Sequence, residues 1–363
     1  MAHTSPAAPP VDAAGSCMPF DSCHDGRPEP TASPMKLTLT LLAAFCCCAC
    51  ARVAPYPKRI PIGASPEGGG PRILALIAHP DDESAFAGAL FASAVEHGSL
   101  VDVICITNGE GGFKYSTLAQ KEHGLELTIE EIGRQHLPRI REAELSRALG
   151  WLGVHELLML GQLDHRYTTD LDEVMIPDQS PWDLDLVRER LTDQLKQGPY
   201  DLLVTLAPSS TTHAHHQAAT LIAAQVVAGL PRDERPVLLV PTGRSLEEQP
   251  TPPPGLEHQP LTTVAAGPFS FNRRTRFGHR DRLDYSIPIL WAMAEHRSQG
   301  TLQMMVGSHD VEDYWVLAAS APDAAQTARE WLDLLRVPTY EVPSYGESAG
   351  TNARWTPQPN KSP

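Results

Sequence analysis

Short apolar runs alternate with segments of helical spacing through the middle of the chain. Apolar runs that lack polar alternation are typical of strands buried on both faces of a parallel sheet. The sequence therefore predicts an α/β fold class: a Rossmann-like, mostly parallel sheet covered by helices on both faces, in a single domain. We predict strands at Ile73–His79, Val101–Thr107, His155–Leu160, Leu202–Ala207 and Val237–Pro241. We predict helices at Ser84–His97, Arg139–Leu152, Leu184–Gln197 and Gln217–Ala228.

The pattern weakens after Pro241. "PTPPPG" at Pro250–Gly255 is predicted to be a loop, because its prolines interrupt any regular element. Beyond it, we predict a helix at Tyr285–Gln299, a strand at Tyr314–Ser320 and a helix at Ala324–Leu335.

Both ends of the chain lack the alternating pattern. The composition indicates a disordered extension over residues 1–34, a Pro/Gly linker over residues 51–71 and a disordered tail over residues 341–363. The folded domain is expected over residues 72–340.

Residues 35–50 are predicted to be a signal peptide with Met35 as the start. The apolar run Leu37–Phe45 is too short to span a bilayer comfortably. The segment resembles a bacterial lipoprotein signal that ends at Cys50, although Cys47 stands where such signals favour Leu. We therefore expect an exported, membrane-anchored protein. A metal-binding cysteine cluster and a cytoplasmic location are the alternatives.

Charge and cysteine content narrow the class of protein. The chain has 363 residues, 44 of them acidic and 29 basic, and carries a formal charge of −15 without a dense Lys/Arg run. Nucleic-acid binding depends on clustered cations, so no nucleic-acid partner is expected. Of the seven cysteines, only Cys105 lies within the predicted domain, which excludes a disulfide framework there.

The first predicted strand ends in an unusual group of side chains. Nucleotide-binding α/β proteins place glycines at this corner, whereas here His79 is followed by Pro80 and then by Asp81, Asp82 and Glu83. These carboxylates would repel phosphate, and they suit a cation. His79 and Asp82 are three residues apart and can face the same way, as two of the three protein ligands of a catalytic zinc site. Acids at a helix N-terminus are the alternative reading, but they leave His79 unexplained.

A second cluster follows the fourth predicted strand. "HAHH" contributes His213, His215 and His216 at the start of the next helix. Both clusters come after the carboxyl end of a strand, where open α/β sheets place their sites. The clusters can therefore converge on one metal ion, although spacing alone does not say which of the three histidines binds it.

These motifs resemble those of the LmbE-like (PIG-L) N-acetylglucosaminyl deacetylases. The resemblance covers roughly Arg72 to Leu302. The matching segments are "AHPDDE" (Ala78–Glu83), "TNGEGG" (Thr107–Gly112), "IREAELSRALGWLGV" (Ile140–Val154), "LGQLD" (Leu160–Asp164), "HAHH" (His213–His216) and "HRSQ" (His296–Gln299).

The resemblance implies a metal site and two catalytic residues. His79, Asp82 and His216 would bind Zn²⁺, or another divalent ion that such a ligand set accepts. Asp81 would take the proton of the attacking water. His213 would stabilise the oxyanion or protonate the leaving amine.

Four further residues are expected to bind substrate: Arg141, Asp164, Glu110 and His296. Arg141 and Asp164 match positions that hold the sugar in the family, Glu110 lies near it, and His296 lies in the late motif. Three of the four also have a simpler explanation. Arg141 could pair with an acid of its own helix, such as Glu144, and His296 could cap a helix end. The "TNGEGG" segment around Glu110 could be only a turn.

The second motif departs from the family pattern. Ala214–His215 stands where Pro-Asp is expected. An Asp there would tune the neighbouring histidines, whereas His215 carries no fixed negative charge.

The predicted function is zinc-dependent hydrolysis of the acetamide of an N-acetylated amino sugar. One alternative is an amidase for another acyl amine or a thiol conjugate, and a second is a catalytically silent, lipid-anchored carbohydrate-binding protein. The expected partner is a small-molecule or glycan substrate, and membrane contact is expected only through the N-terminal lipid. The segment Phe113–Pro138 is expected to rim the pocket. The sequence leaves the substrate and the oligomeric state open.

Overall fold

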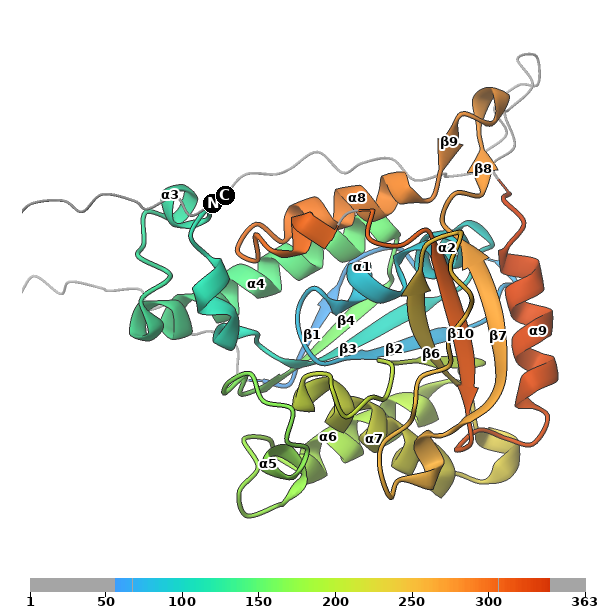
Figure 1. The fold of residues 1–363 in the computed structure, drawn as a ribbon, viewed down its shortest axis with the longest axis horizontal. Helices are drawn as coiled ribbons and strands as arrows, with labels where there is room; N and C mark the ends of the chain where they lie inside the picture. Colours follow the sequence, from blue (N-terminus) through green and yellow to red (C-terminus); the bar gives the residue numbers. More distant parts are fainter. Residues whose placement is uncertain (1–55, 67, 306, 340–363) are drawn as a thin grey trace, which may run out of the picture. The chain divides into compact units, whose positions relative to one another are not determined.

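One eight-stranded sheet organises the part of the chain that the computed structural model describes, residues 56–66, 68–305 and 307–339 (Figure 1). Its strand order is β1-β4-β3-β2-β5-β6-β10-β7. In that order the strands are β1 (Lys58–Pro61), β4 (Glu156–Gln162), β3 (Val101–Thr107), β2 (Ile73–Ile77), β5 (Leu202–Val204), β6 (Val237–Arg244), β10 (Val311–Leu317) and β7 (Val264–Asn272). A separate two-stranded ribbon pairs β8 (Arg276–Phe277) with β9 (Leu283–Asp284).

The middle of the sheet is parallel and its margins are antiparallel. Strands β4, β3, β2, β5 and β6 run parallel to one another. Strand β1 pairs antiparallel with β4, and β10 pairs antiparallel with both β6 and β7. The predicted fold class is confirmed, since the described residues form a mostly parallel sheet in one domain.

Alternate residues of the central strand enter two hydrophobic cores. Ile73, Ala75 and Ile77 face one core, and Leu74 and Leu76 face the other. The first core packs against α1 (Asp82–Phe86), α2 (Gly88–Glu96), α4 (Glu130–Leu152), α8 (Ser286–Glu295) and α9 (Ala324–Leu335). The second packs against α5 (Asp172–Met175), α6 (Leu184–Gln197) and α7 (Ala214–Gly229), on the opposite side of the sheet in Figure 1. The short helix α3 (Gln120–His123) lies outside both cores.

Three predicted elements have the predicted bounds: the strand Val101–Thr107 and the helices Leu184–Gln197 and Ala324–Leu335. Other elements occur with shifted ends. The predicted strand Tyr314–Ser320 lies at Val311–Leu317, and the predicted helix Tyr285–Gln299 is Ser286–Glu295.

The predicted continuous helix Ser84–His97 is wrong, because the structure divides it into α1 and α2. Ala87 leaves the helical conformation, with φ −133° and ψ 19°. The carboxylate of Glu312, from β10, then accepts the backbone N–H groups of Ala89 and Leu90 at 3.0 and 3.2 Å. These N–H groups would otherwise be unpaired at the start of a helix, so a residue 223 positions away caps α2.

The predicted start of the next helix at Arg139 is also wrong. Helix α4 begins at Glu130 and contains Pro138 within it. A proline usually ends a helix, which is why the pattern placed the boundary there. Strand β7 was not predicted either, because Gly267 and Pro268 interrupt its sequence.

The predicted N-terminal extension, signal peptide and C-terminal tail lie outside the described residues. The described residues all belong to one compact unit. Among their helices, none combines the length and the apolar character that crossing a membrane requires.

Candidate metal centre

The three residues predicted to bind metal meet at the carboxyl ends of β2 and β5. Nδ1 of His79 lies 3.1 Å from Nε2 of His216, which lies 3.2 Å from Oδ1 of Asp82. Nδ1 of His79 also lies 3.8 Å from the other carboxylate oxygen of Asp82, Oδ2. Ligands about 2.0–2.1 Å from a tetrahedral ion are roughly 3.3 Å apart, so this donor set fits zinc or a similar divalent ion. His₂Asp with an open position is also a ligand set typical of catalytic zinc.

Local structure orients Asp82. Its Oδ2 accepts the backbone N–H groups of Ala78 and His79 at 3.0 and 2.8 Å, where β2 turns into α1. Burial raises the pKa of Asp82, but the His216 cation and these hydrogen bonds outweigh it, and the net shift is downward. Asp82 is therefore a carboxylate at neutral pH, as metal binding requires.

The two histidines differ in electrostatics. Burial holds the pKa of His79 well below its usual value, with the nearby His216 adding to the effect. Burial also lowers the pKa of His216, but the Asp82 carboxylate raises it more, and the net shift is upward. A metal ion that binds here would compete with a proton for Nε2 of His216.

Asp81, adjacent to the ligands, points to a different partner. Its Oδ2 lies 3.0 Å from Nη2 of Arg141, and its side chain is 21% exposed, so water can reach it. Burial raises the pKa of Asp81, although the Arg141 cation opposes the shift. Asp81 is therefore held by a side chain, Arg141, whereas Asp82 is held by backbone N–H groups.

Arg141 connects the loops that follow β2 and β3. It donates to the carbonyl oxygens of Gly109, at 2.6 Å, and Pro80, at 3.0 Å, in addition to its ion pair with Asp81. The alternative pairing with Glu144 does not occur, because Glu144 accepts hydrogen bonds from the N–H and Oγ of Ser298.

Buried polar atoms without a hydrogen-bond partner among the described residues gather beside Arg141. They are Oδ1 of Asn108, Oε2 of Glu110 and Nε of Arg141 itself. Burial raises the pKa of Glu110 to about 7. Unpartnered buried donors and acceptors are expensive unless a ligand satisfies them, and sugar hydroxyl groups both donate and accept.

The remaining predicted residues occupy three positions around this centre. Asp164 accepts the N–H of Gly111 at 3.1 Å, and its Oδ1 lies 4.0 Å from Nε2 of His79. His213 caps α7, where its Nδ1 accepts the N–H of His215. Burial and the His216 cation lower the pKa of His213 to about 4.

His296 lies behind the corner rather than in the open site. Its side chain is fully buried, and its Nε2 is 2.7 Å from Oε1 of Glu83. Burial lowers the pKa of His296, but the Glu83 carboxylate raises it more, so the net shift is upward.

Sequence reasoning missed several residues around His215. Its Nδ1 lies 3.0 Å from Nε2 of His79, and its Nε2 lies 3.0 Å from Nδ1 of His165. Tyr167 and Trp182 pack against the same cluster, with Tyr167 edge-on to His213 at 4.9 Å and Trp182 at 4.9 Å from His215. The available signal was the run His165–Tyr167, which directly follows the "LGQLD" motif.

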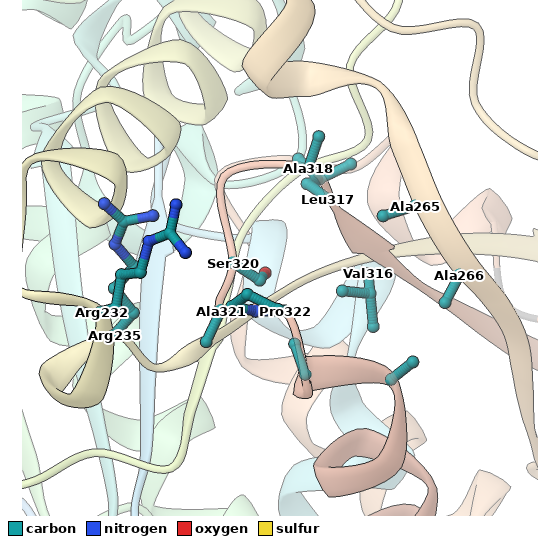
Figure 2. Close-up of a pocket in the computed structure, with 12 residues that line it drawn as sticks. Arg232, Arg235, Ala265, Ala266, Val316, Leu317, Ala318, Ser320, Ala321 and Pro322 are labelled. Carbon is teal, nitrogen blue, oxygen red and sulfur yellow. The ribbon is translucent and has the colours of Figure 1, made fainter.

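A cavity of about 380 Å³ lies away from this centre, between α9, β10 and the residues that follow α7 (Figure 2). Figure 2 shows Arg232 and Arg235 near Ser320 and Ala321. Its lining contains no His, Asp or Glu, so this cavity has neither metal ligands nor a general base.

Comparison with known proteins supports the family resemblance. Residues 74–227 match the family described as "PIG-L: GlcNAc-PI de-N-acetylase". The resemblance inferred from the motifs is confirmed.

Two curated relatives illustrate the family's activities. Over 166 residues the chain is 26% identical to a probable N-acetyl-alpha-D-glucosaminyl L-malate deacetylase 2 of Bacillus cereus, a match that spans 46% of this chain and 65% of the relative. It is 37% identical over 82 residues to a mycothiol S-conjugate amidase of Streptomyces coelicolor, covering 23% of this chain and 28% of that protein. By name, one relative is a deacetylase and the other is an amidase.

Solved structures of deacetylases also resemble this chain. One is the A40926 pseudoaglycone deacetylase Dbv21, at 19% identity and a TM-score of 0.47, with 70% of this chain and 99% of that chain covered. Another is an N,N'-diacetylchitobiose deacetylase from Pyrococcus horikoshii, at 17% identity and a TM-score of 0.42, with 68% and 84% covered.

Proposed function

We propose that this PIG-L family protein is a metal-dependent N-deacetylase that hydrolyses the acetamide of an N-acetylated amino sugar. The observation that carries the proposal is the convergence of His79, Asp82 and His216 beside a separately held carboxylate, Asp81. A binding protein needs the three ligands but has no use for the fourth group.

The three ligands would hold a divalent ion, with zinc favoured by the two imidazoles and one carboxylate. When bound, such an ion supplies Lewis acidity to water and to the substrate carbonyl. The protein supplies the remaining chemistry through its own side chains.

In the proposed mechanism, Asp81 accepts the proton of the attacking water. Arg141 orients its carboxylate, and the raised pKa of Asp81 increases its basicity. On the other side, Nδ1 of His213 is occupied by a backbone N–H, so Nε2 is the nitrogen left to donate. A donor there can stabilise the negative charge that develops on the carbonyl oxygen.

The preference for a sugar rests on the unpartnered atoms of Asn108, Glu110 and Arg141 beside the proposed metal site. A polyhydroxylated substrate can satisfy all three. The S-conjugate amidase among the relatives supports a second candidate, an amidase acting on another acyl amine or a thiol conjugate.

The deciding experiment incubates the purified chain with acetylated amino sugars, acetylated glycans and acylated thiol conjugates, and measures the free amine released. We expect amine from at least one acetylated amino sugar, loss of activity with a chelator, and recovery with added Zn²⁺ or Co²⁺. Release from the thiol conjugates alone would favour the amidase. Binding of sugars without release of amine would contradict catalysis.

We also propose export as a lipoprotein through Cys50. Membrane fractions of cells producing the chain should contain it in a detergent-soluble form, and Cys50→Ser should release it or block its processing. Recovery of the unprocessed chain from the cytoplasm would contradict this part of the proposal.

A further inference from the structure

The two ring nitrogens of His79 face different partners. Nδ1 faces Asp82 and His216, and Nε2 lies 3.0 Å from Nδ1 of His215. A neutral imidazole has one N–H and one lone pair. If Nδ1 gives its lone pair to a metal ion, the proton must be on Nε2, and Nε2 must donate it to His215.

The same reasoning continues outward from His215. Its Nδ1 accepts from His79, so its proton is on Nε2, which lies 3.0 Å from Nδ1 of His165. His165 then carries its proton on Nε2, which lies 3.5 Å from Oε2 of Glu173. The tautomer with its proton on Nε2 therefore suits all three histidines. The series of contacts ends at the carboxylate of Glu173.

The outer carboxylate is held by an arginine. Glu173 accepts Nη2 and Nε of Arg166 at 2.8 and 3.2 Å, and these hydrogen bonds lower the pKa of Glu173. The side chains become more exposed outward. His215 is fully buried, His165 is 20% exposed and Glu173 is 30% exposed.

Packing holds the outer members in place. Helix α7 is joined to the loop after β4 by the N–H of Ala214, which donates to the carbonyl of Thr168 at 2.7 Å. The ring of Trp182 packs 4.9 Å from His215. Asp164 is also near, but its Oδ1 is 3.6 Å from Nδ1 of His215 and 4.0 Å from Nε2 of His79, too far for a hydrogen bond in this arrangement.

Histidines that bind metal usually donate their second N–H to a carboxylate, a carbonyl or water, which fixes the ring and strengthens the ligand. We propose that His215, His165 and Glu173 are positioning residues that together take the place of that carboxylate for His79. In this arrangement the imidazoles of His215 and His165 link the metal ligand His79 to the Glu173 carboxylate near the surface. The proposal rests on the proposed metal site, and it accounts for a histidine at position 215, where the family motif has Asp.

The first experiment measures Co²⁺ binding to the full chain by the visible absorption of the bound ion. Loss of the partner of a metal-binding histidine typically weakens metal binding 10–100-fold. We expect about a 10-fold weaker affinity for His165→Phe, which keeps a ring but removes both nitrogens. We expect roughly a 3-fold loss for Glu173→Gln, which keeps the shape but removes the charge. Arg166→Gln is the matched control, because it removes the surface ion pair of Glu173 and leaves the histidine contact.

The second experiment bypasses the histidine chain. His215→Asp places a carboxylate beside His79, so the outer residues should lose their influence. In this background Glu173→Gln should leave the Co²⁺ affinity unchanged, whereas in the wild type it should lower it. A merely structural role for Glu173 would weaken binding equally in both backgrounds, and that result would overturn the proposal.

Two other outcomes would also overturn it. Equal affinities for Glu173→Gln and Arg166→Gln would mean that the contact with His165 does nothing. Two bound Co²⁺ per chain, falling to one in His215→Asp, would place a second metal ion, and not a proton, between His79 and His215. A wild-type chain that binds no Co²⁺ would instead remove the proposed function itself, and the positioning role with it. Because Glu173 is partly exposed, its variant should fold even if His165→Phe does not.

Discussion

Two neighbouring acids of the same motif each meet a histidine, with opposite consequences. Asp82 lies 3.2 Å from His216 in a site whose histidine remains 19% exposed. Glu83 lies 2.7 Å from His296, and both side chains are completely buried. Each pair joins a carboxylate of α1 to a histidine, so the chemical class of the side chains does not distinguish the pairs.

The number of converging ligands distinguishes them. His79 adds a third donor to Asp82 and His216, whereas Oε2 of Glu83 and Nδ1 of His296 have no partner among the described residues. The Asp82 pair therefore belongs to a group of three residues that could hold a metal ion. The Glu83 pair is a closed ion pair that joins α1 to the end of α8. An acid–histidine contact is therefore a candidate metal site only where a third ligand and access accompany it.

The largest expected effect separates Asp81 from its neighbour. Asp81→Asn should lower turnover by about 10²–10⁴, because it removes the proposed base and keeps the shape of the turn. Metal content, measured by atomic emission, should stay near the wild-type level. Turnover of the wild-type magnitude on a confirmed substrate would contradict the proposed mechanism.

Asp82→Asn should lose activity for a different reason. The amide is a poor ligand for the ion, so metal affinity should fall and excess Zn²⁺ should recover part of the turnover. Asn caps helices about as well as Asp, so if both acids only cap α1, neither variant should change activity. Rescue of Asp81→Asn by added metal, with none for Asp82→Asn, would reverse the assigned roles.

The closed pair should matter for stability instead. Glu83→Gln leaves the His296 cation buried without a counter-charge, which should lower the free energy of unfolding by about 3–5 kcal/mol. Urea denaturation would measure the change. The exposed pair of Glu122 with Arg297 provides the control, since Glu122→Gln should cost less than about 1 kcal/mol. A stable Glu83→Gln variant that no longer binds metal would instead place Glu83 in the site.

The last effect is a pH dependence of stability, and it concerns a buried acid with a neutral partner. Glu96 accepts a hydrogen bond from the hydroxyl of Tyr285 at 2.9 Å, and burial raises the pKa of Glu96 from 4.5 to about 8. Between these values the folded chain holds a proton that the unfolded chain has released, so stability contributed by this group falls as the pH rises from 4.5 to 8. The free energy of unfolding should be lower at pH 8 than at pH 5, and Glu96→Gln should reduce this difference. If the variant shows the same difference as the wild type, Glu96 is ionised in the folded protein at both pH values.

Much of the architecture could be predicted from the sequence, because buried segments have a recognisable apolar pattern. A strand covered on both faces must be apolar throughout, and Val101–Thr107 was predicted with the bounds that the structure shows. The corner at His79–Asp82 was recognisable for the same reason, since polar ligands interrupt an apolar strand at a fixed point.

The prediction failed where distant residues decide the local conformation. The break at Ala87 depends on Glu312, and the helix through Pro138 has no signal in its own sequence. The sequence also could not choose among His213, His215 and His216, which lie within four positions of one another. Sheet order brings β2 beside β5 and so places His216 next to Nδ1 of His79 and His215 next to Nε2, across 137 and 136 residues.

By itself, the amino-acid sequence determined the family, the buried strands and the residue types available at the corner, since each depends on motifs or short-range periodicity. The tertiary structure decided which acid meets which histidine, which pair stays open, and how His215 connects to His165. Those outcomes depend on contacts between separate elements. No local sequence pattern predicts them, because the partners come together only when the sheet has formed.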